Sequence, residues 1–337
     1  MKLTKEQIEQ IAVGAVMVKN IGDSVRLYRF NEEQIAMYLE YNDGEFSEKT
    51  HSSAGARLAF TTDSKTLKLK GNISLASVRY YYAIDLAVNG EHVDSVANFV
   101  GSENSEYFWK KFPIGEFEKV FQLGDGEKQV EVYLPFSVRT DIEEISIDDG
   151  AFIKPLKAKH KGLLFGDSIT QGYDGLHPIN HFAVKLSKLL DVDFVNKAIA
   201  GEVFNPRLAK LKDDIEPDYV VVVYGTNDWG KTPSFEEFKD NCTSFYQNIR
   251  SNYPKAKIFA FSPIWRANLN DEKAFEFKKV HQTIQEVVAT LGNAVYIDGF
   301  DLVPHQPELF ADLHLHPNDN GFKYYADNLC KAIKEKI

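Results

Sequence analysis

Five apolar runs in the second half of the chain most strongly limit what it can fold into. Residues 220–223 are four consecutive valines, and a strand without polar alternation must be covered on both faces, as strands of parallel sheets are. Amphipathic segments of helix length separate the runs. The expected strands are 162–165, 192–198, 219–224, 258–262 and 295–298, and the expected helices are 180–190, 206–214, 234–252, 272–291 and 319–336. This alternation predicts a doubly wound, parallel five-stranded α/β sheet.

The first half of the chain has the pattern of an all-β domain. After a short expected helix at 4–13, apolar and polar residues alternate with a period of two. Asn89-Gly90 lies between two such segments and predicts a hairpin, and residues 124–127 predict a second hairpin. Many short strands with turns between them predict a β-sandwich of jelly-roll type from about residue 14 onward. The pattern changes at the basic segment 154–161, which predicts two domains, residues 1–155 and 156–337.

Charge and cysteine content exclude several classes of protein. The net charge of −10 argues against a nucleic acid or an anionic membrane surface as the partner. Only Cys242 and Cys330 occur, and two free thiols fit a reducing compartment. The first residues are charged where a signal peptide is apolar, and no apolar run has the length to span a bilayer. The sequence therefore predicts a cytoplasmic protein that acts on small molecules.

Polar residues follow four of the expected α/β strands. They are Gly166-Asp167-Ser168 after the first strand, Gly201 after the second, Gly225-Thr226-Asn227-Asp228 after the third and the segment 312–319 after the fifth. Because ligands bind at the carboxyl ends of such strands, these residues should meet at one edge of the sheet. A serine, a glycine amide, a side-chain amide and a histidine are the parts of a serine acyl hydrolase.

Each residue type has a task in ester cleavage. A serine hydroxyl is a weak nucleophile until a base removes its proton, and His316 is the candidate base for Ser168. Attack on an ester creates an oxyanion. The N–H groups of Ser168 and Gly201 and the side-chain NH₂ of Asn227 are its candidate donors.

Other interpretations compete at every position. Asp167-Ser168 is a common helix cap, and Asn227-Asp228 is a common turn pair. His314 and His316 have the spacing of two metal ligands on one face, although a third ligand cluster is missing from the pattern. No glycine-rich phosphate loop follows the first strand, which argues against a nucleotide cofactor.

The four blocks, in this order, resemble the SGNH, or GDSL, hydrolase family over about residues 160–337. Gly166-Asp167-Ser168-Ile169 is similar to the nucleophile block, and Gly201 falls in the second block. Residues 225–228 are similar to the third block, and residues 316–321 are similar to the histidine block. The resemblance implies a flavodoxin-like sheet and ester hydrolysis without a metal or organic cofactor. It also implies Ser168 as nucleophile, His316 as base, and Ser168, Gly201 and Asn227 as oxyanion donors.

One position departs from the family pattern. The family usually places its orienting aspartate three residues before the histidine, where this chain has Leu313. Asp312 can take that role if the loop accommodates an extra residue; otherwise a backbone carbonyl holds the imidazole in a dyad. We predict Asp312. His314 is a rival base, but the Pro-Asn-Asp-x-Gly run after His316 favours His316.

The β domain resembles the jelly-roll partner of two-domain carbohydrate esterases in this family. That analogy implies an acetyl or other short acyl group on a sugar or oligosaccharide. Candidate substrate-binding residues are Asp167, Tyr173, Trp229, Trp265 and Arg266, of which the aromatic ones could form a platform for a sugar ring or could be packing residues.

The predicted function is therefore a serine esterase for short acyl esters. Two alternatives remain open at this point. An acyltransferase would use the same Ser168 with an alcohol in place of water, and a carbohydrate-binding protein would have a silent α/β domain.

Overall fold

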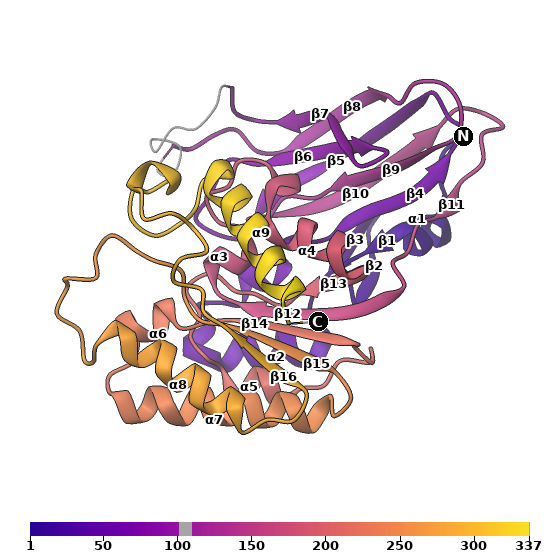
Figure 1. The fold of residues 1–337 in the computed structure, drawn as a ribbon. Helices are drawn as coiled ribbons and strands as arrows, with labels where there is room; N and C mark the ends of the chain where they lie inside the picture. The colour runs from indigo at the N-terminus through magenta and orange to yellow at the C-terminus, as the bar shows by residue number, and fades with distance from the viewer. Residues whose placement is uncertain (101–109, 337) are drawn as a thin grey trace.

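The computed structural model describes residues 1–100 and 110–336. A β-sandwich and an α/β layer structure lie against each other along one broad face (Figure 1). The sandwich comes from the first half of the chain and the α/β part from the second half, as the sequence predicts.

The α/β part is built on five parallel strands. They are β12 (His160–Gly166), β13 (Val192–Asn196), β14 (Tyr219–Val223), β15 (Lys257–Phe261) and β16 (Ala294–Ile297). Their order in the sheet is β13-β12-β14-β15-β16, which is the flavodoxin-like order. The prediction from the valine run is confirmed, because Val220, Val221 and Val222 are 0% exposed and alternate between two separate apolar cores.

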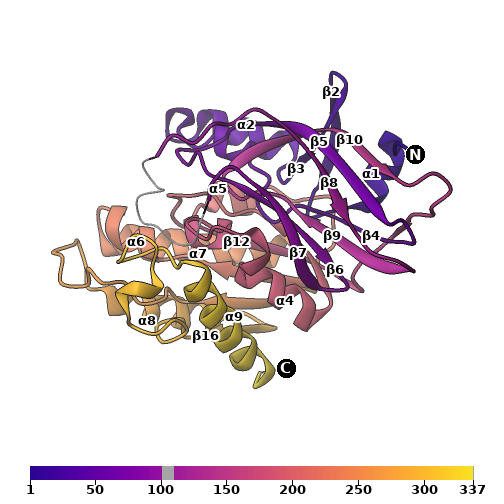
Figure 2. The ribbon, with the colours of Figure 1, turned by 90° about the horizontal axis from the view of Figure 1, so that it is seen from above.

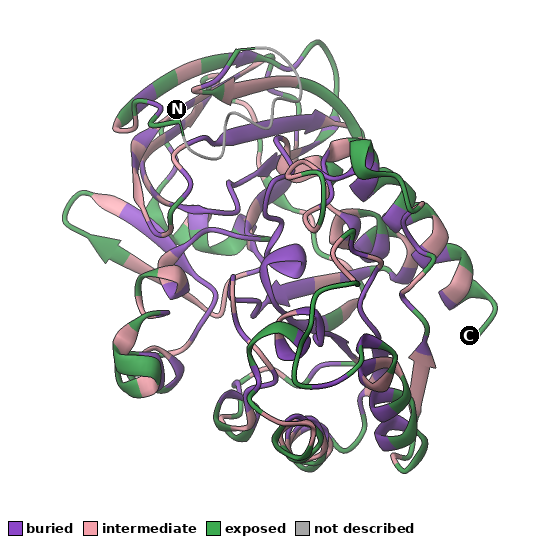
Figure 3. Ribbon diagram, turned by 90° about the vertical axis from the view of Figure 1, so that its left-hand side faces the viewer, coloured by how far each residue is buried: buried purple, intermediate pink, exposed green. Residues whose placement is uncertain are grey.

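Helices cover both faces of this sheet. The bounds are α3 (Ser168–Gln171), α4 (Phe182–Leu190), α5 (Pro206–Lys210), α6 (Thr226–Lys231), α7 (Phe235–Asn252), α8 (Phe277–Ala289) and α9 (Asp319–Lys334). The buried sides of α5, α7 and α8 share one apolar core, and those of α4 and α9 share the other. Figure 3 shows the helices buried toward the sheet and exposed on their outer sides.

The sandwich consists of two antiparallel sheets around a separate apolar core. One sheet has the order β1-β4-β9-β6-β7, with β11 beside β4, and the other has the order β2-β3-β10-β5-β8. The strands are β1 (Ala12–Val13), β2 (Met17–Ile21), β3 (Ser24–Tyr28), β4 (Arg57–Thr62), β5 (Thr66–Leu75), β6 (Ala83–Val88), β7 (Glu91–Ala97), β8 (Glu116–Gln122), β9 (Lys128–Tyr133), β10 (Val138–Ile147) and β11 (Lys154–Pro155). The helix α1 (Lys5–Ile11) precedes them, with Thr4 in a capping box.

The two predicted hairpins have different outcomes. β6 and β7 pair around Asn89 and Gly90, whose φ angles of 51° and 86° suit a tight turn. The second hairpin prediction is wrong, because β8 pairs with β5 in one sheet whereas β9 pairs with β4 and β6 in the other. Residues 124–127 therefore connect the two layers of the sandwich, and a turn signal alone cannot distinguish that connection from a hairpin.

The prediction of continuous β structure from residue 14 to 155 is wrong at one segment. Residues 29–52 carry α2 (Glu32–Glu40) and two short 3₁₀ turns, η1 (Tyr41–Gly44) and η2 (Glu48–His51). The signal was present, since Asn31 and Gln34 form a capping box. Met37 and Tyr38 of α2 join the same apolar core as α5 and α7, and Figure 2 shows α2 near α5. A piece of the first half thus completes the α/β part.

A fully buried arginine fixes this segment to the sheet. Arg29 donates to the carbonyl oxygens of Asn196 and Ala198, at 2.5 and 3.0 Å, and to Ser52 O at 2.8 Å. Cys242 and Cys330 are buried free thiols. Within the described residues, no helix combines the length and apolar character needed to cross a membrane.

Candidate active site

Ser168 lies where β12 turns sharply into α3. Asp167 caps that helix, and its Oδ1 accepts the N–H of Ile169 at 3.0 Å. Gly166 allows the turn, because a Cβ there would lie 2.3 Å from Thr170 Oγ1 and 2.6 Å from Val223 O. The N–H of Ser168 opens the helix and so has no partner within it. The sequence thus presents a serine hydroxyl and a backbone donor together at the end of a central strand.

Three side chains from two distant segments of the chain form a hydrogen-bonded series. Ser168 Oγ lies 2.8 Å from His316 Nε2. His316 Nδ1 lies 2.7 Å from Asp312 Oδ2. This geometry places one imidazole between a hydroxyl and a carboxylate, which is the arrangement of a nucleophile, its base and an orienting group.

The loop that carries Asp312 accommodates the extra residue. Leu313 adopts a left-handed φ of 63° and is 57% exposed, so the additional residue bulges away from the site. Asp312 Oδ1 accepts the N–H groups of His314, Leu315 and His316 at 2.7 to 3.0 Å. His314 has its Nδ1 2.8 Å from the Asp312 carbonyl oxygen. His316 faces Ser168, and the rival His314 is turned to its own loop.

The charges at the site reinforce each other. Burial opposes a charge on His316, but Asp174 and Asp312 together hold its pKa above the ordinary 6.5. Burial would raise the pKa of Asp312, yet the His316 contact and the loop N–H groups hold it well below its usual range. Asp312 is therefore an anion, and His316 is a stronger base than a free imidazole.

A second carboxylate, which the sequence analysis did not single out, also faces the imidazole. Asp174 Oδ2 lies 3.3 Å from His316 Nδ1. Asp174 is buried, and Arg79 of the β-sandwich binds both its oxygens, at 2.8 and 3.0 Å. Tyr81 donates to it at 2.7 Å. No local pattern links residues 79 and 174, so only the packing of the two parts could reveal this contact.

The candidate oxyanion donors are fixed by their surroundings. Asn227 Nδ2 donates one hydrogen to Glu202 O at 3.0 Å, which leaves its second hydrogen for a ligand. Gly201 has a φ of 90°, which strains any other residue. Below this loop, the buried Glu202 carboxylate accepts from Tyr38 at 2.6 Å and from Tyr224 at 2.8 Å. Burial raises the pKa of Glu202 to about 7.

Two lysines place positive charge beside the same loop. Lys231 Nζ donates to Gly201 O at 2.6 Å, and Lys49 Nζ donates to Ala200 O at 2.8 Å. Both Nζ atoms lie within 4 Å of the position that a Cβ on Gly201 would occupy. They hold the two carbonyl groups and add positive potential next to the candidate oxyanion site.

The other candidate substrate-binding residues are mostly internal. Trp229 is 2% exposed and donates from Nε1 to Phe275 O at 2.8 Å. Tyr173 is buried, with its ring centroid 6.2 Å from that of His316. Arg266 is buried and binds Thr226. These positions favour the packing interpretation over an exposed sugar platform.

Trp265 and Asp167 have different surroundings. Trp265 is half-buried and stacks on His305 with centroids 5.2 Å apart. Asp167 is buried, which raises its pKa to about 6, and its hydrogen bond to Ile169 marks it as a cap.

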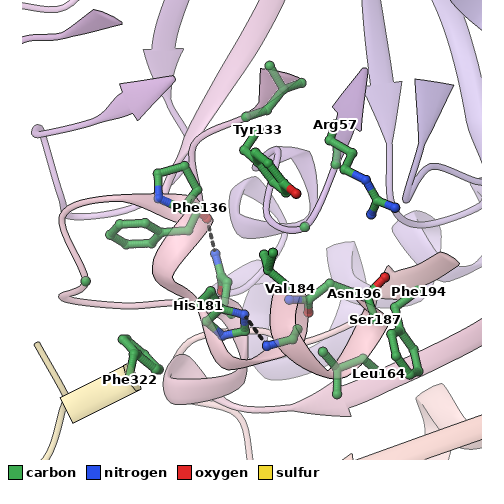
Figure 4. Close-up of a pocket in the computed structure, with 18 of the residues that line it drawn as sticks. Arg57, Tyr133, Phe136, Leu164, His181, Val184, Ser187, Phe194, Asn196 and Phe322 are labelled. Carbon is green, nitrogen blue, oxygen red and sulfur yellow. Dashed lines mark hydrogen bonds between the residues drawn. The ribbon is translucent and has the colours of Figure 1, made fainter. Parts of the chain in front are cut away.

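A small cavity lies beside the C-terminal end of α3. It has a volume of about 50 Å³ between the sandwich and α4 and is lined by Arg57, Tyr133, Phe136, His181 and Phe322, among others (Figure 4). Gln171 of α3 crosses one side and donates to Phe136 O at 2.9 Å. This volume is enough for a few water molecules but not for a sugar.

Comparison with known proteins places this geometry in context. Residues 164–324 match the model of the GDSL-like Lipase/Acylhydrolase family. The comparison with curated proteins found no match.

Three solved structures share the fold over most of the chain. A salicylyl-acyltransferase, SsfX3, from a tetracycline biosynthetic pathway has a TM-score of 0.79 and 20% identity, covering 96% of this chain and 94% of that one. A putative GDSL-like lipase from Bacteroides ovatus has a TM-score of 0.76 and 21% identity, covering 99% and 97%. An acetyl xylan esterase from Butyrivibrio proteoclasticus has a TM-score of 0.58 and 16% identity, covering 84% and 90%. At these identities the likeness is one of fold.

Proposed function

Because residues 164–324 form a GDSL-like lipase/acylhydrolase domain, we propose that this protein is a serine esterase that removes short acyl groups, such as acetyl, from a carbohydrate or a similar small ester. The observation that carries the proposal is the series Ser168, His316 and Asp312, joined by contacts of 2.8 and 2.7 Å.

Acylation begins at Ser168. His316 Nε2 takes the hydroxyl proton while Oγ attacks the ester carbonyl carbon. The imidazole becomes positively charged, and Asp312 stabilises that charge through Nδ1–H. A tetrahedral oxyanion forms, toward which Ser168 N–H, Gly201 N–H and Asn227 Nδ2 donate hydrogen bonds.

The tetrahedral intermediate then breaks down to an acyl-enzyme. The carbon–oxygen bond to the alcohol breaks, and His316 returns its proton to the leaving oxygen. The acyl group is left on Ser168. A water molecule then attacks the acyl carbon while His316 takes its proton. The bond between that carbon and Ser168 Oγ breaks, His316 returns the proton to Oγ, and the carboxylic acid leaves.

An acyltransferase is the second candidate, since an alcohol can take the place of water in the last step. The fold similarity to a salicylyl-acyltransferase over nearly the whole chain supports it. The fold similarity to an acetyl xylan esterase supports a carbohydrate as the ester's alcohol part. Product analysis with an added alcohol separates the two candidates, because only transfer yields a new ester.

The first test is hydrolysis of p-nitrophenyl acetate and butyrate by wild type and Ser168→Ala, with a chelator present. We expect activity that survives the chelator and is lost with Ser168. Activity that depends on a metal and is indifferent to Ser168 would refute the serine mechanism. If neither ester is cleaved, the same comparison on acetylated sugars decides between a narrow esterase and a silent binding protein.

A further inference from the structure

Two carboxylates converge on a single ring nitrogen of His316. Asp312 Oδ2 lies 2.7 Å from Nδ1, and Asp174 Oδ2 lies 3.3 Å from the same atom. Nδ1 carries one hydrogen, which points mainly to the nearer oxygen. The second carboxylate is therefore close enough to act on the imidazole by its charge and to accept the hydrogen if the first moves away.

The second carboxylate is held by the β-sandwich. Arg79, in the loop between β5 and β6, forms a bidentate pair with Asp174, and Tyr81 from the same loop donates a third hydrogen bond. The Asp174 side chain is 0% exposed and that of Arg79 is 10% exposed. Asp174 also has a left-handed φ of 71°. A strained, buried aspartate facing an imidazole indicates a position under functional constraint.

We propose that Asp174, held by Arg79, is a second positioning residue for His316, and that the β-sandwich thereby tunes the base of the active site. The inference rests on the proposed function in so far as His316 is the base. It also assigns a task to the sandwich, which would otherwise be only a neighbouring layer. Residues 156–337 alone would lack both Arg79 and Tyr81.

Asp174 and Arg79 have opposite electrostatic effects on His316. Among the residues that the structure describes, the titratable or charged groups around His316 are Asp312 in its own loop, Asp167 and Tyr173 on either side of α3, Asp174 after α3, and Arg79 from the sandwich. Asp174 favours the protonated imidazole and Arg79 disfavours it. Neutralising Asp174 should lower the pKa of His316, and neutralising Arg79 should raise it.

The test is whether neutralising Asp174 and neutralising Arg79 shift the titration midpoint of His316 in opposite directions. The variants are Asp174→Asn, Arg79→Gln and the double variant, made in the full chain. In each, the acid limb of kcat/KM is measured on p-nitrophenyl acetate, and His316 is titrated by NMR in the Ser168→Ala background. We expect Asp174→Asn to move the midpoint down by about one pH unit and Arg79→Gln to move it up. The double variant, which leaves no unpaired buried charge, should return toward the wild-type midpoint.

A matched ion pair in the sandwich serves as the control. Arg26 and Asp141 are also bidentate and partly buried, with contacts of 2.5 and 2.8 Å. Arg26→Gln and Asp141→Asn should cost stability and leave the His316 midpoint unchanged. A purely structural pair at Arg79 and Asp174 would behave in the same way.

Three outcomes separate the hypotheses. Equal or absent midpoint shifts in the two single variants would overturn the inference, even if both lose activity. If one single variant fails to fold, the other decides by NMR, because an unchanged His316 midpoint in that variant would overturn the inference. If the NMR shifts occur as stated but wild type cleaves no ester, the inference about His316 stands and the proposed function fails.

Discussion

Replacing Asn227 with alanine tests the candidate oxyanion site most directly. The substitution removes one donor, the Nδ2 hydrogen that is not used by Glu202 O at 3.0 Å. Loss of one such donor costs on the order of 10²–10³ in kcat, or about 2.7–4 kcal/mol of transition-state stabilisation. The amide is fixed before substrate arrives, because the buried carboxylate of Glu202 anchors the loop through Tyr38 and Tyr224. We therefore expect the full effect of a preorganised donor.

The loss of folding stability in Asn227→Ala should be much smaller than its loss of transition-state stabilisation. Asn227 is half-buried and gives up one hydrogen bond to a backbone carbonyl, which is worth about 0.5–1.5 kcal/mol. Asn248 offers a matched control, since it is also half-buried on a helix and donates to Pro206 O at 3.1 Å. Asn248→Ala should lose similar stability and keep its activity.

The assay compares kcat/KM on p-nitrophenyl acetate with the unfolding midpoint in urea for wild type, Asn227→Ala and Asn248→Ala. A kinetic loss confined to Asn227→Ala supports its place beside the oxyanion. If Asn227→Ala stays within about twofold of wild type in rate, or if both variants lose rate equally, the assignment of Asn227 is refuted.

Three further predictions concern the pH dependence of activity, the pH dependence of stability and a buried ion pair. Because the pKa of His316 lies above 6.5, kcat/KM should fall as pH drops through that raised value; an acid limb centred below 6.5 would contradict this. By linkage, the same shift adds stability that is complete below 6.5 and is lost as pH rises through the folded pKa, which urea unfolding at several pH values can detect. Lys197→Met removes the charged partner of the buried Asp213, at 2.6 Å, and should cost about 3–5 kcal/mol. Lys212→Met, in the exposed pair with Glu216, should cost under about 0.5 kcal/mol. A loss below 1 kcal/mol for Lys197→Met would show that the buried pair is dispensable.

Local pattern was sufficient for most of the architecture. A run of valines cannot face water on either side, and helix-length segments on both sides of it require a parallel sheet. Strand ends in such a sheet meet at one edge, so Ser168, Gly201, Asn227 and His316 could be grouped before any coordinates. The hairpin predicted at residues 124–127 was wrong, because a turn signal indicates that the chain reverses but does not indicate which sheet the next strand joins.

Asp312 shows the limit of spacing as an argument. It lies four positions before His316, one more than in the family pattern. Whether the extra residue breaks the contact depends on one φ angle, and Leu313 takes the left-handed value that lets it loop outward. The sequence could name the candidate but not the outcome.

The segment 29–52 shows a second limit. Its cap and amphipathic face were visible, yet nothing local indicated that this helix belongs to the core of the other half. Arg29 and Tyr38 contact residues more than 160 positions away along the chain. Arg29 binds carbonyl groups at and just after the end of β13, and Tyr38 binds Glu202.

The sequence by itself thus determined the two kinds of layer and the candidate residues for acyl chemistry, because these follow from periodicity and from side-chain type, whereas the flavodoxin-like sheet was implied by the family resemblance. Only the tertiary structure decided that Asp312 reaches His316 and that Arg79 delivers Asp174 to the same ring. Those contacts join segments of unrelated pattern, and their existence depends on how the sandwich and the sheet pack together, which no short stretch of sequence encodes.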